Sequence, residues 1–434
     1  MNNIPAKVFA TPRWFMVSFR GLIQTFVLAT PTAYALVEGG TSALLLLVAA
    51  ATSFALALNN RDAVERLTRE EWALCLALAA PLMVALASEV IHGEIIWRTL
   101  DSPSRFFIGI PVFLALRRTE PPTFRYFDWA IACGGIACLL VLVPQFHEWG
   151  KMRMESYYMN AIHFGDVALL FAIMTLISVN RKDAAVITAL RLTVVGSAFF
   201  ASFLTGSRGG WIAIPVVGLV YMAVLHRNLS WKLKAALVSG MASILLMIFA
   251  VSPFVRGRVD EIYTDLTGYV AGQRDTSVGV RLQLYEAATR GIAQAPMFGL
   301  GADGFKRLMP IEIERGAVTR IAGVAGEGEV HNQVLAYGAD YGLLGLGVML
   351  SLYLVPSLLF WRAARDPHAS ELRHKAGLLG LSVTVCFAVF GLTVETFNLK
   401  ATVSLYVALI AIIAAASTLR DHTDSRTREL CSNT

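Results

Sequence analysis

Long apolar stretches separated by short polar ones recur along most of the chain. Twelve of them approach the length of a membrane-spanning helix and lie at 15–37, 41–58, 72–91, 104–116, 127–146, 161–179, 186–205, 209–225, 233–253, 337–361, 376–396 and 400–418. About 20 apolar residues cross a bilayer as a helix, and lipid disfavours open sheets because their backbone groups stay unpaired. The pattern therefore predicts an all-α polytopic membrane protein with about twelve transmembrane helices. The stretch at 104–116 is short, so we expect it to be tilted, kinked or re-entrant.

Composition supports a lipid environment. Of the 434 residues, 56% are hydrophobic and only 16% are charged, whereas soluble domains carry about 25% charged residues. The net charge of +6 would suggest a nucleic-acid partner in a soluble protein, but here the basic residues are better explained as topology signals on cytoplasmic loops. We therefore expect membrane lipids, and no nucleic acid, around this chain.

Lys and Arg are distributed unevenly between alternate loops. One set of short loops and ends holds 20 of them: Lys7, Arg13, Arg61, Arg66, Arg69, Arg117, Arg118, Arg125, Arg181, Lys182, Arg227, Lys232, Lys234, Arg362, Arg365, Arg373, Lys375, Arg420, Arg426 and Arg428. The alternate set holds six: Arg98, Arg105, Lys151, Arg153, Arg208 and Lys400. Because basic residues are retained in the cytoplasm, the first set is predicted to be cytoplasmic, together with both termini.

A polar segment of about 80 residues interrupts the apolar pattern. It covers 254–336, falls on the outer side in this topology, and contains an amphipathic stretch at 281–293. We therefore predict a large helical periplasmic loop at 254–336 that carries part of the active site. It separates the first nine helices (1–253) from the last three (337–418), which a cytoplasmic tail (419–434) follows.

Three outward positions could carry chemistry. Arg208 lies in Ser-Arg-Gly-Gly-Trp at a predicted hinge, and Arg281 lies early in the amphipathic stretch. A guanidinium suits phosphate because it is always charged and binds two oxygens. His331, followed by Asn332, marks the return to the membrane, and a neutral histidine is a natural general base. Each residue alone also fits a structural role: an interfacial arginine, a solvated helix arginine and a capping histidine.

Several absences narrow the function. The polar segment has no DxD motif for a metal-held nucleotide sugar, and the chain has no HExxH motif, P-loop or CxxC pair. The five cysteines lie in apolar runs or the tail, so neither a disulfide framework nor a zinc site is expected. Possible intramembrane charges are few (Arg20, Glu89, Asp166), fewer than a proton-coupled transporter usually shows. We expect no metal and no cofactor.

Four motifs occur in order on one predicted side of the membrane. They are Ser-Arg-Gly-Gly-Trp at 207–211, Ser-x3-Arg at 277–281, Ala-Pro-Met-Phe-Gly-Leu-Gly-x3-Phe at 295–305, and His-Asn at 331–332 followed by Tyr-Gly-Leu-Leu-Gly at 341–345. With them, the region 160–396 resembles the O-antigen ligase/polymerase superfamily, and the ligases most closely. One departure is Tyr285, where the family often has Trp.

This resemblance implies a function and roles for the matching residues. Ligases of the family transfer the finished O-antigen from undecaprenyl diphosphate to the lipid A–core acceptor, without metal or ATP, in lipopolysaccharide biosynthesis. Arg208 and Arg281 would bind the diphosphate, His331 would be the catalytic base, and Asn332 would support it. A single displacement would invert the anomeric centre. The location would be the bacterial inner membrane, with a periplasmic active site and the fold of a helical membrane glycosyltransferase.

Other functions remain open at this point. An O-antigen polymerase would use the same chemistry with another acceptor, and Arg290 to Gly301 fits an Arg-x10-Gly spacing associated with polymerases. A protein O-oligosaccharyltransferase is usually longer, and a lipid-linked glycan transporter should show inverted repeats. If the base is not His331, Glu327, Glu329 and Glu395 are the next candidates. The sequence does not specify the glycan, the acceptor sugar or the oligomeric state.

Overall fold

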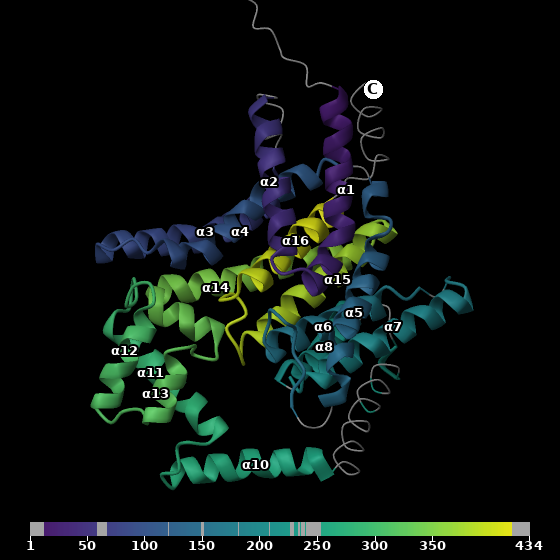
Figure 1. The fold of residues 1–434 in the computed structure, drawn as a ribbon. Coiled ribbons are helices and arrows are strands. Elements are labelled where there is room, and N and C mark those ends of the chain that lie inside the picture. The colour runs from purple at the N-terminus through teal and green to yellow at the C-terminus, as the bar shows by residue number, and fades with distance from the viewer. Residues whose placement is uncertain are drawn as a thin grey trace, which may run out of the picture.

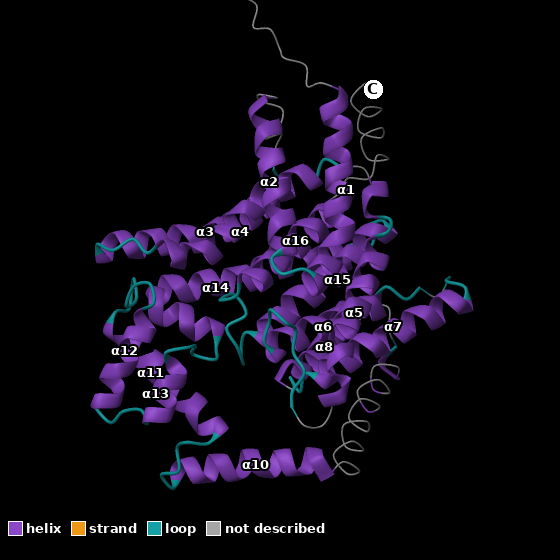
Figure 2. Cartoon of the chain, in the orientation of Figure 1, coloured by secondary structure: helices purple, strands orange, loops and turns teal. Residues whose placement is uncertain are grey.

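The chain folds into helices throughout the part that the structure describes (Figure 2). This computed structural model describes residues 13–58, 67–119, 121–148, 152–180, 182–207, 209–225, 230–232, 235, 239 and 253–418. Its fifteen α-helices are α1 (Arg13–Leu36), α2 (Gly40–Leu58), α3 (Arg69–His92), α4 (Trp97–Leu116), α5 (Phe127–Leu142), α6 (Ala161–Ile177), α7 (Ala185–Leu204), α8 (Ala213–Leu225), α10 (Pro253–Val270), α11 (Ser277–Gln294), α12 (Gly304–Glu314), α13 (Arg320–Gly326), α14 (Gln333–Arg365), α15 (Glu371–Phe390) and α16 (Lys400–Thr418).

These helices confirm a polytopic membrane protein. Among the described residues, α3, α5 with the turn that follows it, α7, α14, α15 and α16 are long and apolar enough to cross a bilayer. Shorter apolar helices cover Gly40–Ala55, Ala161–Ile177 and Gly209–Leu225. A helix lies at eleven of the twelve predicted stretches, while most of 233–253 lies outside the described residues. Twelve membrane crossings therefore remain a prediction.

The fourth predicted stretch is longer in the structure than its apolar run. Helix α4 begins at Trp97 rather than near residue 104 and contains Pro103 and Pro111. Its first turns carry Arg98 and Asp101, which the apolar pattern alone excluded. These polar turns are stabilised by ion pairs: Arg98 contacts Asp303 at 2.7 Å, and Asp101 contacts Arg105 at 3.0 Å.

Helix α16 forms the centre of the membrane bundle (Figure 1). Every residue from Thr402 to Ser417 is buried, and α1, α2, α4, α14 and α15 pack around it. A helix that is apolar on all sides is stable only when other helices or lipid surround it. Gly109 of α4 permits close packing here, because a Cβ at this position would lie 2.3 Å from the Val407 side chain.

Contacts between helix ends show which ends lie together at each end of the bundle. At one end, ion pairs join Glu71 to Arg117, Asp128 to Lys375, and Glu70 to Arg362. At the other end lie the turns 93–96, 152–160, 205–212 and 391–399, linked by contacts such as His163 to Glu395 and Met154 to Leu204. The described residues of the two predicted loop sets therefore lie at opposite ends.

The segment between the membrane helices has its own small core. Helices α10 to α13 are set off from the bundle, and α11 and α12 pack against α14 (Figure 1). Leu284, Phe305, Met309 and Ala322 are buried together there. Helix α11 confirms the amphipathic helix predicted at 281–293, and its buried face explains the periodicity. The division of the chain at 253 and 336 remains a prediction.

Candidate active site

Helix α11, which carries Arg281, contacts the backbone of His331 where it approaches the bundle. The hydroxyl of Tyr285 lies 3.0 Å from the carbonyl oxygens of both His331 and Leu392, to which it donates. Arg281 lies one turn earlier on α11, and residues four apart share a helix face. Tyr285 therefore brings Arg281 to the side of α11 that faces His331. Arg281 forms no ion pair or hydrogen bond with any residue that the structure describes.

The third predicted residue, Arg208, lies outside the described residues, but both of its neighbours are described. The hydroxyl of Ser207 donates to Asp166 at 2.8 Å. A Cβ on Gly209 would lie 3.0 Å from the Thr393 hydroxyl oxygen. Thr393 follows Leu392, which accepts from Tyr285. Gly209, the residue after Arg208, therefore lies against the same 391–399 turn that contacts the His331 region.

The glycines of the Ser-Arg-Gly-Gly-Trp motif have a steric explanation. A Cβ on Gly210 would lie 2.2 Å from a carboxylate oxygen of Asp166, so any larger residue would displace Asp166. Trp211 donates to the Ser202 hydroxyl at 3.2 Å and stacks on Phe203. The described residues of this turn are thus held by contacts with α6 and α7, and their conformation depends on those helices.

His331 has an unusual backbone and a close acidic partner. Its φ is 60°, in the left-handed region, which among described non-glycine residues only Asp303 shares. Such backbones are uncommon and cluster at functional sites. The imidazole Nδ1 is buried and lies 2.6 Å from Glu329 Oε1. The contact is within ion-pair distance but lacks good hydrogen-bond alignment, and Nδ1 has no other polar partner among the described residues. Nε2 is then the nitrogen available to a substrate.

The carboxyl groups of Glu329 and Glu395 differ in protonation state. Burial would raise the pKa of Glu329, but its contact with His331 outweighs burial and lowers that pKa. Burial raises the pKa of Glu395 to about 8. The nearby carboxylates of Glu329 and Asp340 also raise this pKa, whereas the hydrogen bond from the Val330 N–H lowers it in part. Near neutral pH the pair therefore carries one negative charge, on Glu329.

Asn332 supports this arrangement through the backbone. Its side-chain oxygen accepts from the N–H groups of Val334 and Leu335 at 3.0 and 3.1 Å, so Asn332 is the N-cap of α14. An N-cap fixes where a helix begins. The next residue, Gln333, donates its N–H to the Gly391 carbonyl at 2.7 Å and accepts from the Phe397 N–H at 2.6 Å. Asn332 and Gln333 thus fix His331 relative to the 391–399 turn.

The remaining two motifs dock against each other. The N–H groups of Leu300 and Gly301 donate to the carbonyls of Ala339 and Asp340. Helix α14 is interrupted at Gly342 (φ 65°), and Leu343 then donates to the Pro296 carbonyl at 2.7 Å. The motifs at 295–305 and 341–345 therefore have a structural role, which is to attach the α11–α12 connection to α14.

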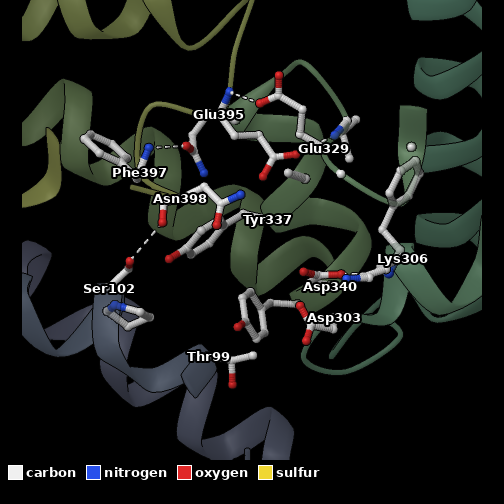
Figure 3. Close-up of a pocket in the computed structure, with 18 of the residues that line it drawn as sticks. Thr99, Ser102, Asp303, Lys306, Glu329, Tyr337, Asp340, Glu395, Phe397 and Asn398 are labelled. Carbon is white, nitrogen blue, oxygen red and sulfur yellow. Dashed lines mark hydrogen bonds between the residues drawn. The ribbon is translucent and has the colours of Figure 1, made fainter. Parts of the chain in front are cut away.

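A polar cavity of about 390 Å³ lies next to Glu329, the residue that contacts His331 (Figure 3). Glu329 and Glu395 lie at one end, Thr99, Asp303, Asp340 and Lys306 at the other, and Ser102, Tyr337 and Asn398 between them. Its walls come from the start of α4, from α12 and α14, and from the 391–399 turn. Arg281 and the described residues of the 205–212 turn are not part of its lining.

Sequence reasoning missed several residues of this site. Arg98, Lys306 and the positioning role of Tyr285 were not identified, nor was Arg153, whose Nε donates to the Thr205 carbonyl at 2.9 Å beside the Ser-Arg-Gly-Gly-Trp turn. The only signal was that Arg98 and Arg153 are among the few basic residues in the outward set. No group of three or more His, Cys, Asp or Glu among the described residues is placed to hold a metal ion.

Comparison with known proteins places the three predicted residues in one family segment. Residues 192–350 match the family described as O-Antigen ligase. The chain carries an O-antigen ligase family domain. The resemblance inferred from the motifs is thereby confirmed, and the O-antigen ligase family domain contains Arg208, Arg281 and His331. It also includes α11, α12, α13 and the first half of α14.

Two relatives extend the match beyond this domain. A Haemophilus influenzae protein described as uncharacterized is 26% identical over 280 residues, which cover 63% of this chain and 69% of that protein. The O-antigen ligase of Escherichia coli K12 is 22% identical over 181 residues, 42% of each chain. The alignment thus spans less than half of that ligase.

Proposed function

We propose that this protein transfers a glycan from undecaprenyl diphosphate to a hydroxyl of the lipid A–core, at the periplasmic face of the bacterial inner membrane and with both termini in the cytoplasm. The observation that carries this proposal is that Tyr285, one turn from Arg281 on α11, contacts the carbonyls of His331 and Leu392, with Gly209, the neighbour of Arg208, against the same 391–399 turn. The 20-to-6 distribution of basic residues supports the orientation.

Arg208 and Arg281 would bind the diphosphate of the donor. The diphosphate leaves with the electron pair of the bond to the anomeric carbon, so negative charge grows on its bridging oxygen. Guanidinium groups stabilise this charge more in the transition state than in the ground state. Arg281 suits the role because no described acidic residue neutralises it.

His331 would accept the proton of the attacking hydroxyl. As the acceptor oxygen forms its bond to the anomeric carbon, its proton moves to Nε2 of His331. The Glu329 carboxylate beside Nδ1 stabilises the resulting imidazolium and fixes the orientation of the ring. Attack and departure on opposite faces of the carbon would invert the anomeric centre. No step in this scheme requires a metal or a cofactor.

The residue spacing associated with polymerases has a structural explanation in this protein. Arg290 binds Glu312 through Nε at 2.9 Å, and Glu312 is 1% exposed. Gly301 has a φ of 85°, and a Cβ there would lie 3.2 Å from the His92 ring. The Arg-x10-Gly spacing is thus accounted for by an ion pair to a buried glutamate and by a left-handed turn, so we give this spacing no weight in choosing the acceptor.

One assay tests the proposed function. The purified protein is given undecaprenyl-diphosphate-linked glycan, with either lipid A–core or a second lipid-linked glycan as acceptor, in excess EDTA. We expect glycan-bearing lipid A–core as the product. Transfer only to the second lipid-linked glycan would instead identify a polymerase. Loss of activity in EDTA that Mg²⁺ or Mn²⁺ restores would contradict the metal-independent scheme.

A further inference from the structure

The cavity next to Glu329 differs in charge from the arginine side of the site. Its lining includes the carboxyl groups of Asp303, Glu327, Glu329, Asp340 and Glu395, against the cations Arg98, Lys306 and Lys400. Arg98 is paired with Asp303, and Lys400 with Asp101. Of these three cations, only Lys306 forms no ion pair with a described residue. A diphosphate here would lie among carboxylates, which is unfavourable.

The polar groups of the cavity suit hydroxyl-rich molecules. Carboxylates accept hydrogen bonds from hydroxyl groups, and the Asn398 amide and the Thr99 and Ser102 hydroxyls can donate or accept. Phe305, Tyr337 and Phe397 add apolar surface for sugar rings. Small-molecule sites combine apolar walls with a few placed polar groups and measure about 300–1,000 Å³. At about 390 Å³, this cavity would hold one end of a longer glycan.

The geometry of an inverting displacement assigns the cavity to the acceptor. This step rests on the proposed function. In an inverting displacement the attacking hydroxyl approaches opposite to the leaving diphosphate. Arg281 reaches His331 through Tyr285, whereas the cavity reaches it through Glu329, which lines the wall and contacts Nδ1. A molecule in the cavity therefore lies on the Glu329 side of His331, in a space that Arg281 does not line, and its reacting hydroxyl would extend past the ring to Nε2.

We infer that the cavity formed by α4, α12, α14 and the 391–399 turn is the acceptor subsite, which binds a neutral, hydroxyl-rich stretch of the acceptor glycan next to its reacting sugar. Its ligand class is the outer, unphosphorylated sugars of the lipid A–core. The glycan and diphosphate of the donor bind elsewhere, on the side of Arg281. The subsite thereby sets acceptor specificity, and Glu329 is the lining residue through which it adjoins His331.

Bulky substitutions in the cavity test this assignment. Ser102→Trp and Lys306→Trp place an indole at the α4 wall and the α12 wall, away from His331, Glu329 and Arg281. With lipid A–core as the acceptor, each should raise the acceptor KM at least tenfold and change the donor KM less than twofold. The matched control is Glu314→Trp, an exposed position on α12 outside the lining, which should change neither constant. A raised donor KM with an unchanged acceptor KM, or no change in either, would overturn the assignment.

A binding measurement tests the cavity independently of catalysis. Full-length protein in nanodiscs is mixed with lipid-free core oligosaccharide, and saturation-transfer NMR identifies the sugars in contact with the protein. We expect contact at the outer sugars, reduced in Lys306→Trp and unchanged in Glu314→Trp. Absence of contact with the wild-type protein would refute the acceptor subsite. If the wild-type protein bound the oligosaccharide but transferred no glycan, the proposed function would fail while the binding site stood.

Discussion

At the scale of single residues, the site depends on a histidine held in a conformation that most side chains avoid. The left-handed backbone of His331 brings Nδ1 to Glu329, only two residues earlier, while its carbonyl accepts from Tyr285. Left-handed residues cost about 1–3 kcal/mol unless the surroundings enforce them. Here the Asn332 cap and the Gln333 hydrogen bonds provide that enforcement.

Replacement of His331 should separate chemistry from binding. His331→Asn keeps a residue that tolerates left-handed backbone but removes the base, so kcat should fall about 10²–10⁴-fold with donor affinity retained. Arg281→Ala and Arg208→Ala should both raise the donor KM and lower kcat, and lysine at either position should rescue poorly. Steady-state kinetics measures these effects, with Arg320→Ala as an exposed control. A folded His331→Asn protein with near-normal kcat would show that the base lies elsewhere.

Glu329 should act as a positioning residue. Glu329→Gln removes the charge beside Nδ1, so kcat should fall about 10- to 100-fold while the donor KM stays within twofold. Glu329→Asp should recover part of kcat because the charge is restored, which a merely structural role would not predict. Glu314→Gln, at an exposed position on α12 outside the cavity lining, is the control for kcat. If Glu327→Gln reduced kcat and Glu329→Gln did not, Glu327 rather than Glu329 would be the positioning residue.

Glu395 should make the stability of the protein depend on pH. A carboxyl whose pKa is raised on folding, here to about 8 by burial beside Glu329 and Asp340, stabilises the fold fully below its unfolded pKa of about 4.3. That contribution is lost as the pH rises to about 8. Glu395→Gln cannot ionise, so its melting temperature relative to wild type should increase between pH 5 and pH 9. Parallel melting curves of the two proteins over this range would contradict the assignment.

At the scale of elements, the interruption of α14 is what attaches the α10–α13 segment to the membrane helices. Gly342 lies in the break, with non-helical backbone, and the following residue donates to Pro296. The first part of α14 belongs to the small core with α11 and α12, and the rest packs with α15 and α16. One helix thus serves both parts and carries His331 at its start.

Gly342 should therefore be intolerant of substitution. A Cβ there would lie 2.5 Å from the Pro296 carbonyl oxygen, and its φ of 65° strains any L residue. Gly342→Ala should destabilise the protein by about 1–3 kcal/mol or more and lower activity with it. Gly347→Ala, five residues later in α14 with nothing within 4 Å of the added Cβ, should be neutral or stabilising by up to about 1 kcal/mol. Thermal unfolding in detergent compares the two, and equal melting temperatures would exclude a special role for the break.

At the scale of the whole molecule, the two ends of the helix bundle have different compositions. The end with Glu71–Arg117 and Asp128–Lys375 contains members of the abundant basic set, and the end with the site contains Arg98, Arg153 and Lys400. Basic residues near membrane helices stay in the cytoplasm, so the site is predicted to face outward, as the proposed function requires.

Topology follows from this asymmetry. Tags at both termini and within 362–375 should report from the cytoplasm, and tags within 260–325 should report from the periplasm. Fusions to alkaline phosphatase and green fluorescent protein give opposite signals in the two compartments, and each serves as the control for the other. A cytoplasmic report from 260–325 would overturn the orientation and the proposed site together.

The sequence by itself determined the helices, the membrane environment and the residue types of the site. Apolar runs fix helices in lipid because no other local structure satisfies the backbone there. The largest errors in described helices were the polar start of α4, which ion pairs stabilise, and the end of α15, which lies at Phe390 rather than near residue 396. Arg281 and His331 became candidates because a guanidinium suits phosphate and a histidine can accept a proton, but only the family resemblance distinguished them from structural residues.

Only the tertiary structure decided how these residues work together. The donor side joins α11 to His331 and the 391–399 turn, and the cavity joins α4 to α12, α14 and that same turn. These segments are separated by up to about 300 residues, so no local pattern encodes their proximity. Packing around α16 and the break at Gly342 establish it, and burial beside Glu329 gives Glu395 a protonation state that its sequence neighbours could not reveal.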